Sequence, residues 1–411
     1  MRTRATTRGH DITATFVRWL GLRGLLNRGY VLTSGLYFVI TGHLSASQLV
    51  WLGTGMSLAL LFADIPAGVL ADSISRKWTL VIGQLLLATA MVLTGLVTTF
   101  SLLVLSQVVW GLGWAFLNGA DVAWLNDELN DPHRIARVLT ASARWGVAGR
   151  AVGMLTFGLL GWATNLATAI IVAGVAMALL AIFVAVRFTE RNFTPKRVQR
   201  WETALEIFRR GISLARRDQE ILLVFVATLA LNSATMVAWL FPRQLINLGF
   251  PSNPILWYTA IGILSAALGV MALSIVEARI DGVGVARRYY AFACLIGVLG
   301  LVALAVAPVA LIGGVGVLLL NGITDSVTRP ISVVWVNRRT TSDVRATVHS
   351  FLSQAESMGE ICGGFLLAAL AQVRGISVTL LAAGAVLALT GIVVAWSRAD
   401  RASMPLMNGR G

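Results

Sequence analysis

Apolar stretches about as long as a membrane is thick recur through almost the whole chain. A helix that crosses the hydrocarbon core needs roughly 20 mostly apolar residues. Twelve stretches meet this length, near residues 25–43, 47–71, 78–98, 102–126, 139–162, 166–187, 221–246, 255–277, 289–308, 311–336, 346–371 and 376–397. They predict an all-α integral membrane protein with twelve transmembrane helices.

The composition supports this class. Hydrophobic residues make up 57% of the chain and charged residues 13%, with a mean hydropathy of +0.78. About a quarter of the residues of a soluble domain are charged, so an ordinary soluble globule is excluded. The net charge of +14 would suggest a nucleic-acid partner in a soluble chain. Here the arginines collect in particular loops instead, so no nucleic acid is expected and the lipid bilayer is the surrounding partner.

Two further features concern processing. Cys294 and Cys362 both lie in apolar stretches, so no disulfide framework is expected. The first twenty residues contain four arginines but no continuous apolar core. We therefore expect no cleaved leader, and the first span would serve as the insertion signal.

Positive charge is distributed unequally between the two sets of loops. With the amino terminus inside, the loops after even-numbered spans contain Arg76, Lys77, Arg134, Arg137 and the arginines of 187–217, 279–288 and 338–345. The opposite set contains Arg374 in a loop and Arg243 near a helix end. Positive residues are retained on the cytoplasmic side. The expected location is therefore the plasma or inner membrane, with both termini cytoplasmic.

The longest polar segment, residues 188–220, divides the chain into two halves of six spans. We expect a first bundle at 1–187, a cytoplasmic linker at 188–220 and a second bundle at 221–411. Within the linker, apolar residues recur at helical spacing among arginines, which predicts a helix lying on the inner membrane surface. These apolar residues are Trp201, Leu205, Phe208 and Ile212.

The two halves repeat short sequences. Asn118-Gly119 recurs as Asn321-Gly322, and Trp124-Leu125-Asn126 recurs as Trp335-Val336-Asn337. Both separations are near half the chain length, which indicates an internal six-plus-six repeat.

A charged turn separates the second and third spans. Its pattern, Gly68-x-Leu70-Ala71-Asp72-x-x-x-Arg76-Lys77, resembles the loop between helices two and three of the major facilitator superfamily of secondary transporters. Ser73 and Ser75 replace the family's usual Arg and Gly. The alternative is an ordinary cytoplasmic loop with positive-inside charges.

This resemblance implies a conformational switch. In the family, the acid of the loop and the arginine four residues later form a charge relay with an acid at the end of helix four. The matching residues here are Asp72, Arg76 and Asp127, with Gly68 and Lys77 as the flanking motif residues. Breaking and remaking such a relay accompanies the change between outward-open and inward-open forms.

Two departures weaken a closer assignment to proton and drug antiporters. Those members carry an Arg four residues before a Gly in helix four, and here Gln107 precedes Gly111. They also carry a Gly-Pro signature in helix five, where this chain has Arg150 in place of the Pro.

Ionisable residues inside apolar spans form the second group of candidates, because each costs about 3 kcal/mol or more to place in hydrocarbon. They are Asp64, Asp121, Arg144, Arg150, Asp325, Arg329, Glu356 and Glu360. From their depths we expect Asp121 to pair with Arg144, and Arg329 to lie near Glu356 and Glu360. Two carboxylates one turn apart resist joint ionisation, so one of them is expected to carry a proton. The alternative is purely structural ion pairing.

The family's cavity is lined mainly by helices one, four, seven and ten. The resemblance therefore implies substrate contacts from aromatic and amide side chains on these helices. They are Tyr30, Tyr37, Trp110, Trp114, Asn118, Asn232, Trp239 and Asn321. The alternative for each aromatic residue is packing or anchoring at the membrane interface.

The remaining chemistry is sparse. Neither lysine lies in a phosphate-binding loop, and the four histidines form no metal-binding pattern. We expect no enzyme, cofactor or metal site. The sequence favours a monomeric secondary active transporter, similar to drug or metabolite exporters, that couples protons to the efflux of small amphipathic molecules. The alternatives are an importer or facilitator of a nutrient or metabolite, and a non-transporting receptor on the same fold.

Overall fold

The computed structural model describes residues 2–195, 213, 218–279, 283–339 and 342–397, and every regular element in these ranges is a helix. The first half contains α1 (Arg2–Ile40), α2 (Ala46–Ser73), α3 (Arg76–Leu96), α4 (Phe100–Leu117), α5 (Ala120–Leu129), α6 (Pro132–Ala163) and α7 (Leu166–Arg187). The second half contains α9 (Gln219–Thr235), the 3-10 turn η1 (Met236–Leu240), α10 (Phe241–Asn247), α11 (Pro254–Glu277), α12 (Val283–Val306), α13 (Ala310–Val317), the π-helix η2 (Leu318–Thr324), α14 (Asp325–Arg339) and α15 (Ser342–Trp396).

Ten helices in the described ranges are long and apolar enough to cross a membrane. That number treats α15 as one helix, although the left-handed backbone of Gly375, with φ 80°, divides it into two segments. It omits α1, whose apolar sequence is interrupted by Arg23, Asn27 and Arg28. With α1 and both segments of α15, the helices accommodate the twelve predicted spans. The predicted all-α membrane fold is confirmed, whereas the helix predicted around Trp201 lies outside the described residues.

Short polar turns join the helices, and side chains at the helix starts satisfy N–H groups that have no partner within the helix. Asp131 accepts hydrogen bonds from the backbone N–H groups of His133 and Arg134 at the start of α6. Asn165 and Ser45 cap α7 and α2 in the same way. These caps fix where each helix begins. Because the connecting turns are short, consecutive helices pack as antiparallel neighbours.

The sequence repeat coincides with helix irregularities in both halves. The predicted fourth span is broken into α4 and α5 at Asn118 and Gly119, and Gly119 has φ 76°, which favours glycine. The predicted tenth span changes to a π-helix over η2, which contains Asn321 and Gly322. Such π-helical segments commonly lie at functional sites.

Glycines place two pairs of helices in close contact. A Cβ atom at Gly149 or Gly153 of α6 would lie within 2.3 Å of a backbone oxygen of α1. A Cβ atom at Gly359 or Gly363 of α15 would lie 2.3 Å from a backbone oxygen of α9. Small residues four apart allow such close approach in membrane proteins. The two seams are therefore a second feature that the halves share.

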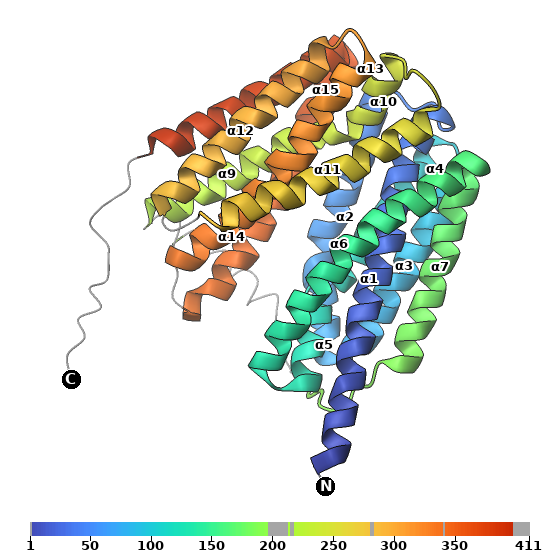
Figure 1. Ribbon diagram of the computed structural model, residues 1–411, viewed down its shortest axis with the longest axis vertical. Coiled ribbons are helices and arrows are strands. Elements are labelled where there is room, and N and C mark those ends of the chain that lie inside the picture. Colours follow the sequence, from blue (N-terminus) through green and yellow to red (C-terminus); the bar gives the residue numbers. More distant parts are fainter. Residues whose placement is uncertain (1, 196–212, 214–217, 280–282, 340–341, 398–411) are drawn as a thin grey trace, which may run out of the picture.

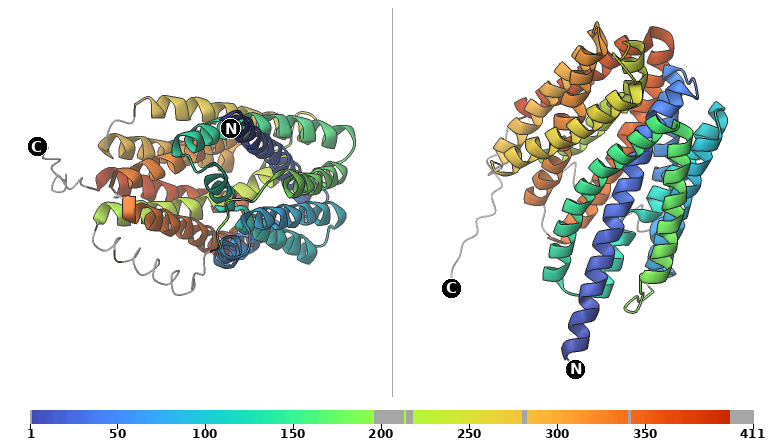
Figure 2. Two further views of the ribbon diagram at one scale, coloured as in Figure 1. Left: turned by 90° about the horizontal axis from the view of Figure 1, so that it is seen from below. Right: turned by 45° about the vertical axis from the view of Figure 1, so that its right-hand side comes forward.

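The two bundles lie close together near α10 and α13 and diverge toward the start of α6 and the end of α14 (Figure 1; Figure 2, right). We call the side with the turns at 74–75, 130–131 and 188–195 the arginine-rich face, and the side with the turns at 41–45, 164–165 and 248–253 the arginine-poor face. Side-chain contacts between the halves include Ser57 with Glu360, Phe38 with Trp239, Trp51 with Phe365 and Arg243 with the carbonyl oxygen of Leu44. All of these contacts lie in the part of the spans nearer the arginine-poor face.

Candidate functional site

Three charged side chains from α2, α3 and α5 meet at the arginine-rich face. Arg76 Nη2 lies 3.6 Å from Asp72 Oδ1, and Arg76 Nη1 lies 2.8 Å from Asp127 Oδ2. Arg76 also donates a hydrogen bond to the carbonyl oxygen of Ala123. One guanidinium thus joins three helices of the first half through charge-assisted contacts. The structure brings together the predicted switch residues, while Gly68 lies half-buried in α2, one turn before Asp72.

Two acids that the sequence analysis did not select attach the segment after α7 to this cluster. Glu190 accepts hydrogen bonds from the backbone N–H groups of Arg76 at 2.7 Å and Lys77 at 3.1 Å. The N-terminus of α3 favours such a carboxylate. Glu128 accepts from the backbone N–H groups of residues 191 and 192. Lys77 contributes its backbone here, and its ammonium group lies 5.6 Å from the ring centre of Trp78.

The second half carries a buried ion pair near the corresponding position. Arg287 at the start of α12 pairs with Glu220 at the start of α9 and lies 5.5 Å from the ring centre of Trp335. Trp335 donates to Glu220 at 3.1 Å. Its repeat partner Trp124 donates to the carbonyl oxygen of Thr189 at 2.8 Å. Each of the two repeated tryptophans therefore donates a hydrogen bond from its own helix to a neighbouring segment of the chain. The sequence repeat alone did not predict these hydrogen bonds.

The predicted pairing of Asp121 with Arg144 is wrong. Asp121 of α5 instead accepts a hydrogen bond from Arg23 of α1 at 3.1 Å, while Arg144 is exposed on α6. The Arg23 guanidinium also lies 4.4 Å from the ring centre of Trp19 and 5.8 Å from that of Trp114. Counting residues from the helix end estimates how deep Asp121 lies in the membrane, but it does not show toward which neighbouring helix its side chain points. The break at residues 118–119 changes the face of the helix on which Asp121 lies.

A polar cavity of about 250 Å³ lies among α9, α14 and α15. Its lining includes Asn232, Asp325, Arg329, Glu356 and Glu360. Arg329 forms an ion pair with Glu356, which confirms their predicted proximity. Glu360 accepts a hydrogen bond from Ser57 of α2 at 2.7 Å, so this carboxylate touches the other half of the protein. Two acids one turn apart on α15 thus have different partners.

A second cavity, of about 370 Å³, adjoins the first at Asp325 and lies between the halves. Arg28 of α1 lines this cavity from the first half, and Asp325 and Asn321 line it from the second half. Asp325 lies within electrostatic range of both Arg28 and Arg329. Neither Arg28 nor Asp325 forms an ion pair with a described residue, so both charges face the cavity. Arg150 lies beside α1 and is within electrostatic range of Arg28.

The third cavity, of about 250 Å³, is largely aromatic and shares Val31, Ala238 and Tyr258 with the second. Its further lining includes Tyr30, Gln107, Trp110, Trp239, Phe38 and Met56. Gln107 donates to the Tyr30 hydroxyl at 2.9 Å. The N–H group of Trp110 is buried without a hydrogen-bond partner among the described residues. A molecule in this cavity would meet aromatic rings and a free donor.

Four further predicted residues, in addition to Asp121, Arg144 and Arg150, lie away from these three cavities. Tyr37 is buried in the first half and donates to the carbonyl oxygen of Val97 at 2.9 Å. Trp114 packs against Trp110, with ring centres 6.0 Å apart, and faces Arg23. Asn118 is exposed at the end of α4. Asp64 is exposed on α2, two turns from Ser57 toward the arginine-rich face.

Sequence reasoning missed several cavity residues. Arg28 could have been selected as an ionisable residue in a span, but it lies in the polar half of α1. Tyr258 lies on α11, outside the helices that the family resemblance emphasised, and Gln107 was noted only as a departure from the antiporter pattern. In the described ranges, no group of three potential metal-ligating side chains was found.

Comparisons with known proteins agree with this fold. A family model described as Major Facilitator Superfamily matches residues 24–341. No curated protein matches the chain. The nucleoside transporter NupG superposes with a TM-score of 0.76 at 15% identity, covering 94% of this chain and 99% of its own. A bacterial homologue of the human lysosomal transporter Spinster, inward-facing and unoccupied, gives 0.71 at 14%, covering 94% and 96%.

The peptide transporter POT, in complex with sulfate, gives a TM-score of 0.68 at 13% identity and covers 92% of this chain and 93% of its own. At these identities the solved structures share the fold alone. The family model, in contrast, spans more than half of the chain. The chain therefore belongs to the Major Facilitator Superfamily and is a multi-pass membrane transport protein.

Proposed function

We propose that this protein is a proton-coupled secondary transporter that exports small amphipathic molecules by alternating access. The observation that carries the proposal is the set of adjoining cavities between the halves, one of which is lined by Arg28 of the first half and Asp325 of the second. Ionisable groups are expensive inside a membrane and are retained there for function or for pairing. Unpaired charges from both halves on one cavity favour a function in binding.

The chemistry of the cavities supports an amphipathic substrate. The part lined by Tyr30, Trp110 and Trp239 offers ring surfaces, and the part lined by Arg28 and Asp325 offers both signs of charge. A molecule with an aromatic or aliphatic body and an ionised group would satisfy both parts. Asn321 and Asn232 would add amide hydrogen bonds at the polar end.

The carboxylates of α15 are the proposed coupling site. Glu356 forms an ion pair with Arg329, whereas Glu360 accepts a hydrogen bond from the Ser57 hydroxyl and forms no ion pair with a described residue. A carboxylate without a cation partner in a low-dielectric site binds a proton more readily than one within an ion pair. Glu360 is therefore the proposed proton carrier. Because it also joins α2 to α15, its protonation state would act on the contact between the halves.

The proposed orientation places the arginine-rich face and both termini in the cytoplasm. The halves touch near the arginine-poor face, so this arrangement would be an inward-open state. The cluster of Asp72, Arg76 and Asp127 would hold α2, α3 and α5 together while the halves rock, and its rearrangement would accompany the switch. The proposed division is 1–187, 188–220 and 221–411, acting as a monomer.

The test is a ligand screen followed by flux measurements. Purified protein would first be screened for thermal stabilisation by amphipathic amines, amphipathic acids and nucleosides. The best ligand would then be followed in vesicles with an imposed pH gradient. Proton-coupled export predicts accumulation on the external side against the substrate gradient, abolished by a protonophore. Accumulation toward the cytoplasmic side would identify an importer, and movement only down the substrate gradient would identify a facilitator; either result would contradict the proposal.

A further inference from the structure

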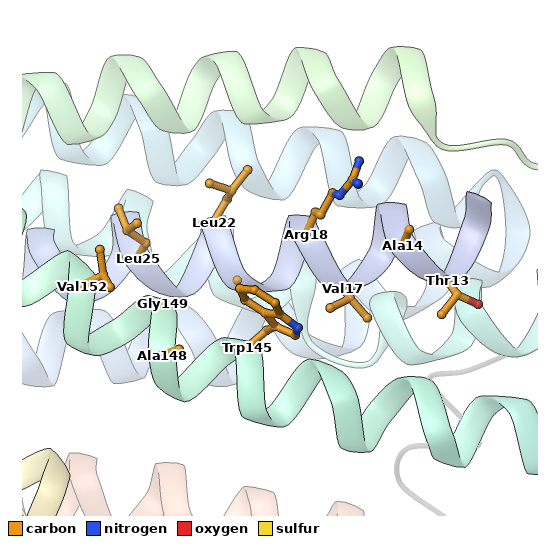
Figure 3. A pocket seen from close by; sticks show the side chains of 11 residues that line it. Thr13, Ala14, Val17, Arg18, Leu22, Leu25, Trp145, Ala148, Gly149 and Val152 are labelled. Carbon is orange, nitrogen blue, oxygen red and sulfur yellow. The ribbon is translucent and has the colours of Figure 1, made fainter. Parts of the chain in front are cut away.

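A large apolar groove lies outside the transport cavities, on the outer surface of the first half. It has a volume of about 750 Å³ and runs between α1 and α6 (Figure 3). Most of its lining is apolar, including Val17, Leu22, Leu25 and Val152. A pair of glycines explains the position of the groove. Gly21 and Gly149 allow the backbones of α1 and α6 to approach closely, and they have no side chains that would fill the space beside the contact.

The polar features of the groove lie on the side toward the arginine-rich face. Arg18 is exposed on α1 and has no ion pair or hydrogen bond with a described residue. Trp145 of α6 is 63% exposed and lies against α1 at Gly21 (Figure 3). Exposed Trp is typical of the level of the lipid headgroups. Arg18, which has no partner among the described residues, and the indole of Trp145 therefore form a polar region on an otherwise apolar groove.

The length of the groove corresponds to one leaflet of a bilayer. Its lining on α1 extends from Thr13 to Leu25, which is about 18 Å at the rise of an α-helix. Half of a hydrocarbon core measures roughly 15 Å. The deep end at Leu25 and Val152 lies within a turn of Arg28 and Arg150, so the groove approaches the transport cavity from the lipid side.

We propose that this groove binds one anionic phospholipid, with its phosphate at Arg18 and Trp145 and an acyl chain along Leu22, Leu25 and Val152. Charge complementarity favours an anionic headgroup, because basic sites between transmembrane helices at the positive face select such lipids. The apolar length favours a lipid over a small soluble anion. This site would be occupied whether or not the protein exports its substrate.

The test uses lipid retention as its measurement. The protein would be reconstituted into bilayers of equal parts phosphatidylcholine and phosphatidylglycerol and extracted in mild detergent, and its bound lipids would be counted by native mass spectrometry. We expect several-fold enrichment of phosphatidylglycerol in the unaltered chain. Arg18→Gln should remove that enrichment, and Arg18→Lys should keep most of it. Arg288→Gln, an exposed arginine of the second half at the same face, is the matched control and should have no effect.

A second variant tests the groove itself. Ala148→Trp places an indole in the space beside Gly149 and should lower retention of both lipids, while the melting temperature reports whether the bundle is intact. Equal retention of both lipids, unchanged in Arg18→Gln, would mean that the groove holds annular lipid only and would overturn the proposal. A dimer that Ala148→Trp dissociates would also overturn it, by identifying a second copy as the occupant.

Discussion

Glu356 and Glu360 are one turn apart on α15, yet they are held differently. The first is matched by the charge of Arg329, and the second by the dipole of Ser57. Neutralising each should therefore have different consequences. The pair of variants separates coupling from structure because the two carboxylates have the same chemistry and nearly the same depth.

We predict that Glu360→Gln abolishes pH-driven uphill transport but spares counterflow, because counterflow needs only binding and the conformational change. Glu356→Gln should lower the melting temperature and every mode of transport together, because Arg329, in a transmembrane segment, loses its ion-pair partner. Ser57→Ala is the control that removes the hydrogen bond but keeps the carboxylate. Uphill transport at the normal rate in Glu360→Gln would exclude it as the proton carrier.

A residue-scale prediction also follows from the partner of Asp121. Since Arg23 contacts this carboxylate, Asp121→Asn and Arg23→Gln should each lower the melting temperature. The double variant should lose less than the sum, with a coupling of about 0.5–3 kcal/mol. Arg144→Gln is the control and should be additive with Asp121→Asn. Coupling of Asp121 to Arg144 in such a cycle would contradict the observed geometry.

At the scale of helices, the glycine seams determine how closely α1 approaches α6 and α9 approaches α15. A methyl group at Gly153 would lie 2.0 Å from the carbonyl oxygen of Leu25, whereas at Gly146 its nearest neighbour is Arg150 Nη1 at 3.8 Å. Alanine is favoured over glycine within a helix by about 1 kcal/mol. Alanine is therefore expected to destabilise the protein at Gly153 and to be tolerated at Gly146.

We predict that Gly153→Ala lowers the melting temperature because the backbones must separate, whereas Gly146→Ala leaves it unchanged or raises it. Thermal unfolding of the purified variants in one detergent measures both. If Gly153→Ala were as stable as the unaltered chain, the seam would not be a close-packed contact.

The helices also show which features a sequence can disclose. Long apolar stretches are recognised by their length, and charged residues such as Arg329 and Glu356 are recognised because the residues around them are apolar. Arg23 and Arg28 were less visible, since the first span is polar through much of its length. The side chain of Asp121 points toward α1 because the helix is broken at Gly119. A break of this kind rotates the following residues about the helix axis, and the depth of a residue in the membrane does not reveal that rotation. Tyr258 lies at the cavity through the packing of α11 against the first half, which is a tertiary property.

At the scale of the whole molecule, orientation is open to a direct measurement. In a variant without Cys294 and Cys362, cysteines at Thr189 and Asn408 should be protected from an impermeant reagent in intact cells, and one at Ser252 should react. The distribution of arginines is the physical reason. Labelling at Thr189 from outside would reverse the proposed topology, with permeabilised cells as the control for accessibility.

In the proposed rocking motion, the contacts in the part of the spans nearer the arginine-poor face would be the pivot about which each half rotates. α6 has 32 residues, and Met154 touches Gly262 of the other half at a point 22 positions from Pro132. At 1.5 Å per residue this part of α6 measures about 33 Å, so a rotation of roughly 10° would move its end by about 6 Å. The hydrogen bond between Ser57 and Glu360 would lie near this pivot, where the same rotation displaces atoms least. A displacement of the size of one hydrogen bond at that point would therefore correspond to a displacement several times larger where the helices reach the arginine-rich face.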